Sequence, residues 1–384
     1  MACINIDNIP FLNSYNLKNP ELIWAESSVS ATQKHLEDEY DFFFMQLSND
    51  KCLDVFDLDE ILTAEVVEDL KNKKYFLVID NSLEYFVSQI ESIYTKIIDV
   101  YNIPEEQVIF LSSIPNIEYY VNYTAKRLGK PSIKCEWFSL FEVVGKEALE
   151  NKGDYVNLPK SMKVYDKKFL NLNRRWRLHR PLLVTLLRDK GLLHEGHISL
   201  AKSDDGGNWS TSLNKLQRMY ATNDEISKII HRNLDIVSLP DMYLDTGDLV
   251  TNRAMHENSV NKYYEQTYFS VITETTYHEN IPFLSEKVFK AIAMGHPFIL
   301  VSAPNTLQYL KELGYKTFHP MIDEKYDTIT DHGERMLYIV KEIERLCNMD
   351  RSNLKKWLKS ARFVAKHNMR ILNNRTNYTI KKNY

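Results

Sequence analysis

The segment at residues 268–318 constrains the fold of this 384-residue chain more than any other. It opens with an aromatic and β-branched run at residues 268–276, which predicts a buried strand. A polar loop follows, then a short helix that begins at Ser285 and ends at Gly295, and then a second apolar strand over residues 297–302. A strand, a helix and a strand in this order predict a parallel sheet covered by helices.

The start of that helix carries the groups expected of an anion-binding site. Ser285 is a favourable N-cap, so the first backbone N–H groups and the positive end of the helix dipole face the preceding loop. An anion placed there gains about 0.3–1 kcal/mol from the helix end, and Lys287 adds a full positive charge. Glu286 can accept hydrogen bonds from sugar hydroxyls beside that anion. A phosphate partner next to a diol partner suits a sugar nucleotide.

A second strand-to-helix turn is rich in hydrogen-bond donors. A strand is predicted at residues 168–173 and a helix at 180–190, and the donors are Arg174, Arg175, Arg177, His179 and Arg180. Ligands of open α/β sheets bind beyond the carboxyl ends of the strands, and a guanidinium group donates two parallel hydrogen bonds to a phosphate. A solvated basic loop paired with acidic neighbours is the alternative. It is disfavoured because the Ser285–Lys287 site is predicted at the same edge.

The first half of the chain also alternates strands and helices. The predicted strands are 41–47, 74–79, 107–112 and 132–135, and the predicted helices are 84–101 and 117–128. A chain of this length is expected to form two domains, and the polar stretch at 146–163 is the predicted linker. We therefore expect an α/β protein with two αβα domains, at residues 1–155 and 156–345, that face each other across a cleft. Residues 346–384 form a separate basic segment.

The composition favours a cytoplasmic protein. No run of about 20 apolar residues is present, so no membrane span is expected, and the N-terminus lacks a secretory pattern. The four cysteines are scattered without zinc or disulfide spacing, which fits a reducing compartment. We expect a monomer or a weak dimer.

The charge is distributed unevenly along the chain. Residues 1–70 hold fifteen acidic and three basic side chains, whereas residues 351–384 hold ten basic and no acidic ones. The later segment predicts an amphipathic helix, with an apolar stripe at Leu354, Leu358, Ala361 and Ala365 and basic positions at Lys355, Lys359, Arg362, Lys366 and Arg370. It is expected either to cross back onto the acidic first domain or to follow the phosphates of DNA.

Two stretches of the second half resemble known families. Thr273-Glu274-Thr275 followed by Ser285-Glu286-Lys287 resembles the donor site of the α-1,3-fucosyltransferases, which are inverting sugar-nucleotide enzymes of the two-domain GT-B fold. Residues 173–180 and 293–327 are similar to glycosyltransferase-like proteins of large bacteriophages. The resemblance covers residues 168–330, and Ser285 stands where threonine is commoner.

This resemblance implies roles for individual residues. Glu286 would bind ribose or sugar hydroxyls, Lys287 and Arg180 would hold the diphosphate with Arg177, and Glu274 would face the donor sugar. Tyr326 would stack on the nucleotide base, and Arg174, His179 and Ser285 complete the predicted donor-binding set. Cations at a diphosphate can replace a metal ion, so neither a metal nor a resident cofactor is expected. A metal pair at Asp323–Asp327 is less favoured than a solvated loop.

An inverting transfer also needs a general base on the acceptor side. Asp80 and Glu84 follow the strand at 74–79, and Glu84 is the favoured base, with Glu118 in reserve. The alternatives are a helix cap at Asp80 and a surface position for Glu84.

The sequence thus predicts a glycosyltransferase that uses a nucleoside-diphosphate sugar. The phage resemblance favours a hydroxymethylated DNA base as acceptor, flipped out of the duplex in the host cytoplasm. A cell-surface glycan or protein is an alternative acceptor, and a non-catalytic DNA-binding protein with a degenerate sugar-nucleotide fold is an alternative function. A nucleotide-sugar epimerase is disfavoured because no Gly-x-Gly-x-x-Gly loop is present.

Overall fold

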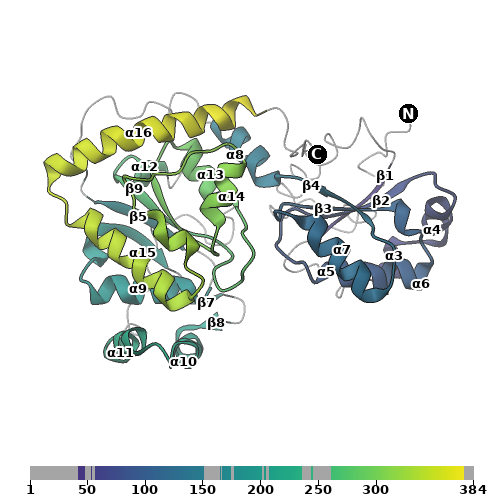
Figure 1. Ribbon diagram of the computed structural model, residues 1–384, viewed down its shortest axis with the longest axis horizontal. Coiled ribbons are helices and arrows are strands. Elements are labelled where there is room, and N and C mark those ends of the chain that lie inside the picture. Colours follow the sequence, from purple (N-terminus) through teal and green to yellow (C-terminus); the bar gives the residue numbers. More distant parts are fainter. Residues whose placement is uncertain are drawn as a thin grey trace. The chain divides into compact units, whose positions relative to one another are not determined.

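The computed structural model describes residues 42–47, 53, 57–150, 165, 167–173, 177–200, 203–204, 207–235, 244 and 261–375. The chain divides into two compact units with the boundary between Val144 and Gly145. Each unit contains its own parallel sheet with helices packed around it (Figure 1). The expected α/β class is confirmed, because strand–helix alternation produces parallel strands in both units.

The first unit is built on a four-stranded sheet in sequential order. Its strands are β1 (Phe42–Gln46), β2 (Phe76–Asn81), β3 (Val108–Ser112) and β4 (Lys134–Trp137), all parallel. These strands match the four predicted from apolar runs. The helices are α3 (Leu58–Ile61), α4 (Ala64–Lys71), α5 (Gln89–Ser92), the π-helical η2 (Ile93–Ile98), α6 (Asp99–Tyr101), the short η3 (Glu105–Gln107), α7 (Ile117–Leu128) and α8 (Leu140–Glu150). Helix α7 ends at Gly129, whose φ of 66° lies in the left-handed region that glycine adopts readily.

The sheet of the second unit reverses its order at its centre. Its strands are β5 (Phe169–Asn173), β6 (Gly196–Leu200), β9 (Phe269–Thr273) and β10 (Phe298–Val301), arranged as β10-β9-β5-β6 and all parallel. The chain passes from β5 to β6 on one side and then returns to place β9 on the other side of β5. Ligands of open α/β sheets bind at such a switch point, beyond the carboxyl ends of the strands.

The second unit has more elements than the sequence predicted. Its helices are α9 (His179–Asp189), η5 (Leu193–Glu195), α10 (Trp209–Met219), α11 (Asp224–Arg232), α12 (Asn261–Tyr264), α13 (Glu286–Ala293), α14 (Thr306–Glu312), η8 (Glu324–Thr328), α15 (His332–Cys347) and α16 (Arg351–Asn374). The added elements include the hairpin of β7 (Ser203–Asp204) and β8 (Gly207–Asn208), which directly precedes α10.

The boundary between the units falls before the predicted linker. Helix α8 runs through it, and Gly145 lies against Phe289 of α13, so that a Cβ atom on Gly145 would come within 2.8 Å of the Phe289 Cβ. This close approach attaches the second half of α8 to the second unit, whereas a domain start at residue 156 was expected. Residues 151–164, most of the predicted linker, lie outside the described residues.

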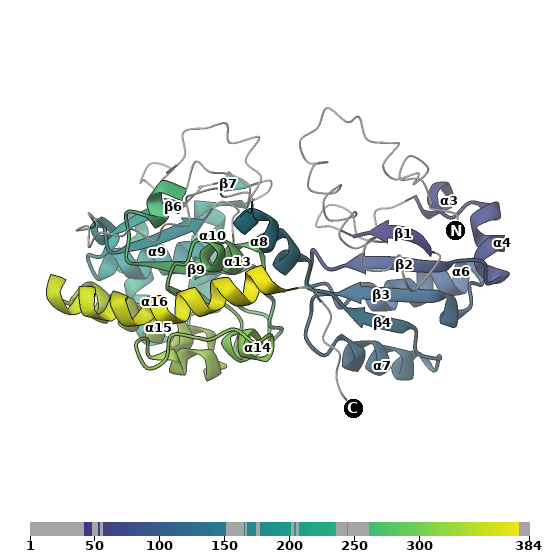
Figure 2. The same ribbon diagram turned by 90° about the horizontal axis from the view of Figure 1, so that it is seen from above.

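The basic helix belongs to the second unit rather than to a separate segment. Helix α16 packs against α13 and runs along the outside of this unit (Figure 2). The Trp357 indole Nε1 donates to the Met321 carbonyl at 2.9 Å, and its ring lies edge-on to Phe269 of the central strand. The apolar stripe predicted at Leu354, Leu358, Ala361 and Ala365 is buried, as expected. Residues beyond Arg375 lie outside the described part of the chain.

None of the helices in the described ranges combines the length and the apolar character needed to cross a bilayer.

Candidate functional site

A buried amide pair joins β5 to β9 at the switch point. Asn171 Nδ2 donates to the Val271 carbonyl at 2.7 Å, and Asn173 accepts a short hydrogen bond from the Thr273 hydroxyl. Asn173 Nδ2 also donates to the Ser199 carbonyl of β6 at 3.1 Å. These three polar side chains are buried, so their hydrogen bonds fix the register of three strands where the strands end. Sequence reasoning missed them, although two asparagines at the end of an apolar strand are a usable signal.

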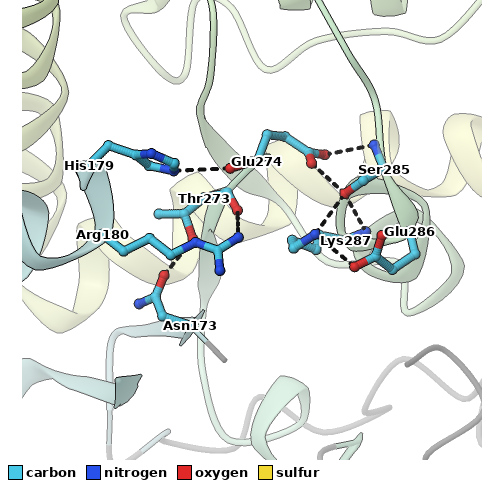
Figure 3. A network of polar contacts seen from close by, with 8 residues as sticks. All are labelled: Asn173, His179, Arg180, Thr273, Glu274, Ser285, Glu286 and Lys287. Carbon is cyan, nitrogen blue, oxygen red and sulfur yellow. Dashed lines mark hydrogen bonds and ion pairs between the residues drawn. The ribbon is translucent and has the colours of Figure 1, made fainter. Parts of the chain in front are cut away.

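The first turn of α9 is attached to the end of β9. Arg180 Nη2 donates to the Thr273 carbonyl at 3.3 Å, and His179 Nε2 lies 3.0 Å from the Glu274 carbonyl (Figure 3). Because a carbonyl oxygen only accepts, the proton of the imidazole resides on Nε2. Burial, followed by the charge of Arg180, holds the pKa of His179 well below 6.5. His179 is therefore a neutral donor that positions the strand end, and Arg180 is the cation of this turn.

A second chain of contacts joins the same strand end to the start of α13. Ser285 donates from its backbone N–H to Glu274 Oε1 at 3.2 Å, and from its hydroxyl to Glu274 Oε2. Lys287 Nζ donates to Ser285 Oγ at 3.0 Å and to Glu286 Oε1 at 2.7 Å. Ser285 is the N-cap of α13, as predicted, and its Oγ accepts from the Lys287 N–H. The last residue of β9, Thr273, and the residue after it, Glu274, thus hold both helix starts.

Two cations from separate helices consequently lie around the Thr273–Glu274 strand end. Arg180 comes from α9 and Lys287 from α13, and both are linked to this strand end by the contacts drawn in Figure 3. The charge of Arg180 also lowers the pKa of Glu286, the neighbour of Lys287. The side chains of Lys287 and Glu286 keep 27% and 26% of their surface exposed, so solvent and solutes reach them. Arg180 and Lys287 are thus both connected to the end of β9, and their binding of one shared ligand stays a prediction.

Glu274 differs from Glu286 in its exposure and in the direction of its pKa shift. Burial raises the pKa of Glu274 above 4.5, against the lowering effects of the Lys287 charge and of the hydrogen bonds from Ser285. Burial also acts to raise the pKa of Glu286, but the charge and hydrogen bond of Lys287 outweigh it, so that pKa is lowered. Glu274 is fully buried with both oxygens on Ser285. This geometry favours a role for Glu274 in positioning α13 rather than the predicted contact with a donor sugar.

These opposite shifts predict opposite pH effects on stability. Above pH 4.5 the folded protein binds more protons at Glu274 than the unfolded chain does, so this contribution to stability falls as pH rises through the raised pKa. Glu286 contributes stability above 4.5 that is lost as pH falls through its lowered pKa. We expect Glu274→Gln to flatten the decline of stability toward neutral pH, and Glu286→Gln to flatten the decline toward acid pH. Urea titrations over a pH series test this, and two variants with profiles parallel to the parent would contradict it.

Arg335, which sequence reasoning also missed, supports the loop after β9 through hydrogen bonds to backbone carbonyls. This arginine is almost fully buried, and it donates to the carbonyls of Ile329 at 2.7 Å and Thr330 at 3.2 Å, and to that of Tyr277. Its guanidinium carbon lies 4.5 Å from the centre of the Tyr277 ring, and that ring stacks on His179. Arg335 thereby holds the loop that carries Glu274. An arginine on the apolar side of α15, beside Met336 and Ile339, was the available signal.

Other predicted residues lie elsewhere or outside the described part. Tyr326 is only 2% exposed, and its hydroxyl accepts from the Leu300 N–H of β10. It therefore belongs to the core and is not among the contacting residues drawn in Figure 3. Arg174 lies outside the described residues, whereas Arg177 is close enough for its charge to lower the pKa of His179.

The acidic group at Asp323–Asp327 has structural roles. Asp323 caps η8, Glu324 Oε1 accepts from the Phe318 N–H at 2.6 Å, and the Asp327 carboxylate accepts from the first N–H groups of α14. These backbone partners account for carboxylates that the sequence left open as a metal pair.

The two candidate bases lie in the first unit, at the end of β2 where they were predicted. Asp80 is buried, and its Oδ1 accepts from the Ser82 N–H at 2.8 Å, so it caps the turn after the strand rather than a helix. Glu84 is buried as well, which contradicts the alternative of a surface position. Glu118 is exposed in the first turn of α7. The choice of base stays a prediction.

Comparison with known proteins gives only distant likenesses. No family model and no curated protein matches the chain. Among solved structures, the chain is similar to the N-terminal domain of Candida albicans trehalose-6-phosphate phosphatase, with 10% identity, a TM-score of 0.41, and coverage of 91% of this chain and 72% of that one. It is also similar to a UDP-forming alpha,alpha-trehalose-phosphate synthase from Burkholderia vietnamiensis, with 9% identity, a TM-score of 0.42, and coverage of 91% and 75%. It is also similar to the corresponding synthase from Burkholderia multivorans, with 9% identity, a TM-score of 0.36, and coverage of 83% of this chain and 74% of that one. Likenesses this remote carry no argument about activity, so the α/β assignment rests on the two parallel sheets themselves.

Proposed function

We propose that this chain is a glycosyltransferase that binds a nucleoside-diphosphate sugar in its second unit. The observation that carries the proposal is the placement of Arg180 and Lys287 around one strand end at the switch point of the sheet. Two cations from separate helices, beside a helix N-terminus, suit a doubly charged diphosphate better than a single carboxylate. The partly exposed Glu286 next to them supplies an acceptor for ribose or sugar hydroxyls.

The contacts among these residues define how the ligand would enter. Lys287 is paired with Glu286 at 2.7 Å, so its charge already has a partner within the site. An incoming diphosphate would replace that partner on the flexible lysine side chain, which frees the Glu286 carboxylate for sugar hydroxyls. Arg180 is held by the Thr273 carbonyl and keeps a fixed orientation. Arg177 and Arg174 extend the cationic turn in this proposal.

The proposed reaction needs charge stabilisation and one proton acceptor. The bond between the sugar and the diphosphate breaks and the diphosphate leaves with the electron pair, while the acceptor oxygen bonds to the sugar carbon and loses its proton to a base. Arg180 and Lys287 stabilise the leaving charge, a role that a metal ion fills in other enzymes. Glu84 or Asp80 is the proposed base. Inversion at the sugar carbon is part of the proposal through the family resemblance.

The favoured acceptor is a hydroxymethylated base of DNA, with a cell-surface glycan or protein as the alternative. Incubation with radiolabelled sugar nucleotides, hydroxymethylcytosine DNA and glycan controls distinguishes the acceptors. Label on glycan but never on DNA would reject the favoured acceptor and keep the enzyme class.

A thermal-shift panel tests donor binding directly. We expect one of UDP, GDP, ADP and CDP to stabilise the protein, by about 2.7 kcal/mol when its concentration is 100 times its dissociation constant. The corresponding monophosphate should give a smaller shift, because it presents fewer charges to Arg180 and Lys287. If none of the four diphosphates raises the melting temperature and no sugar nucleotide is consumed, the proposed function is wrong.

A further inference from the structure

The outward side of α16 carries a stripe of cations with one aromatic ring among them. The stripe, here called the basic face, consists of Lys356, Lys359, Phe363, Lys366 and Arg370. Its members follow one another at intervals of three or four residues, so they lie along one side of the helix. All five are exposed, and Phe363 is 70% exposed. At 1.5 Å per residue the stripe extends for about 21 Å.

The opposite side of α16 fixes the orientation of this stripe. The buried positions are Leu354, Trp357, Leu358, Ala361, Ala365, Asn368 and Leu372. Asn368 Nδ2 donates to the Lys316 carbonyl at 2.8 Å, and its Oδ1 accepts from the Lys316 N–H at 2.9 Å. The helix is therefore held at two positions along its length, Trp357 and Asn368. It cannot rotate to bury the basic face without breaking these hydrogen bonds.

The cations of the basic face differ in their pairing from several other cations of this unit. Within the described ranges, no ion pair joins any of the four to a carboxylate, whereas Lys168, Lys190 and Arg345 are paired with Glu195, Glu344 and Glu342. Asp350, the N-cap of α16, is the acidic group whose pKa Lys356 helps to lower. Helix α16 itself contains no Asp or Glu. A concentrated row of uncompensated charge attracts polyanions.

We propose that the basic face of α16 binds the phosphate backbone of DNA, with Phe363 in contact with a base or a sugar. The proposal rests on the proposed function, because it names DNA as the acceptor that the glycosyltransferase holds. Cations spaced along a helix match a line of phosphates, and an aromatic ring among them supplies a stacking surface. An anionic membrane fits less well, because interfacial helices insert a broad apolar face, and this face offers a single phenylalanine.

Salt dependence of DNA binding gives the sharpest test. With a fluorescent duplex and the matching single strand as probes, four phosphate contacts predict slopes of log affinity against log salt of about −3.6 for the duplex and −2.8 for the single strand. The double variant Lys366→Gln and Arg370→Gln should make the duplex slope shallower by about 1.8. Phe363→Ala should weaken single-strand binding by about tenfold without changing the slope. A Lys311→Gln and Lys341→Gln variant, with exposed charges on α14 and α15, should behave like the parent.

The outcomes distinguish a failure of this inference from a failure of the proposed function. Absence of DNA binding, a slope that the Lys366 and Arg370 changes leave intact, or binding to phosphatidylserine vesicles but not to DNA would each overturn the inference. The thermal shift with nucleoside diphosphates is measured on the same variants. A retained shift without DNA binding rejects the basic face alone, whereas DNA binding without any nucleotide response rejects the proposed function.

Discussion

Replacing Lys287 with methionine is expected to lower kcat/KM for the preferred sugar nucleotide by about 10²–10³-fold. Methionine keeps most of the length of the side chain but removes the charge that lies 3.0 Å from Ser285 Oγ and 2.7 Å from Glu286. The variant lacks the cation that is proposed to stabilise the negative charge that develops on the leaving diphosphate, so kcat is expected to fall along with affinity. Steady-state kinetics and the thermal shift with the matching nucleoside diphosphate measure the two effects separately.

A matched change elsewhere in the same unit controls for the loss of charge. Lys341 is exposed on α15, so Lys341→Met removes one positive charge without touching the contacts in Figure 3. It should leave both kcat/KM and the nucleotide response within twofold of the parent. Should Lys287→Met instead keep the full thermal shift, the phosphate site has been assigned to the wrong residues.

Replacing Arg335 with methionine is expected to reduce the free energy of unfolding of the second unit by about 3–5 kcal/mol. The substitution leaves the carbonyls of Ile329, Thr330 and Tyr277 without their charged donor in a buried setting. It also removes the cation that lies on the Tyr277 ring. Urea titration followed by circular dichroism measures the loss.

An exposed arginine on another helix provides the comparison. Arg218 lies on the surface of α10, and Arg218→Met should change the free energy of unfolding by no more than about 0.5 kcal/mol. Equal unfolding midpoints for the Arg335 and Arg218 variants would show that the buried guanidinium does not support the loop. A partly folded Arg335 variant should also respond less to nucleotide, because Tyr277 stacks on His179 beside Arg180.

Local patterns along the chain were enough to predict most of the sheet. The apolar runs at β2, β3, β9 and β10 are buried as expected, because a strand covered on both faces needs few polar residues. The start of α13 was equally predictable, since an N-cap serine acts on neighbours only two residues away. These features depend on residues that are close together along the chain, so they can be predicted from the sequence.

Features that depend on distant partners were not predictable in the same way. Glu274 and Tyr326 were expected to face a ligand, yet both are buried. The Glu274 carboxylate accepts a hydrogen bond from the Ser285 N–H, and the Tyr326 hydroxyl accepts one from β10. A carboxylate or a phenol is compatible with either setting, and only the tertiary fold decides between them. Helix α15 had a usable local signal that was overlooked, because Asp331 is an N-cap whose carboxylate accepts from the Glu334 N–H at 2.7 Å. The reversal of strand order between β5 and β9 has no local signature.

That reversal has a consequence for the order in which the protein matures. The hydrogen bond between Asn173 and Thr273 closes a loop of 100 positions along the backbone, and pairing over such a separation is slow relative to local structure. During synthesis, the first α9 turn leaves the ribosome long before β9 and Lys287 do. On the proposed function, nucleotide binding would therefore be gained late, because a nascent chain that stalls before α13 still lacks Lys287.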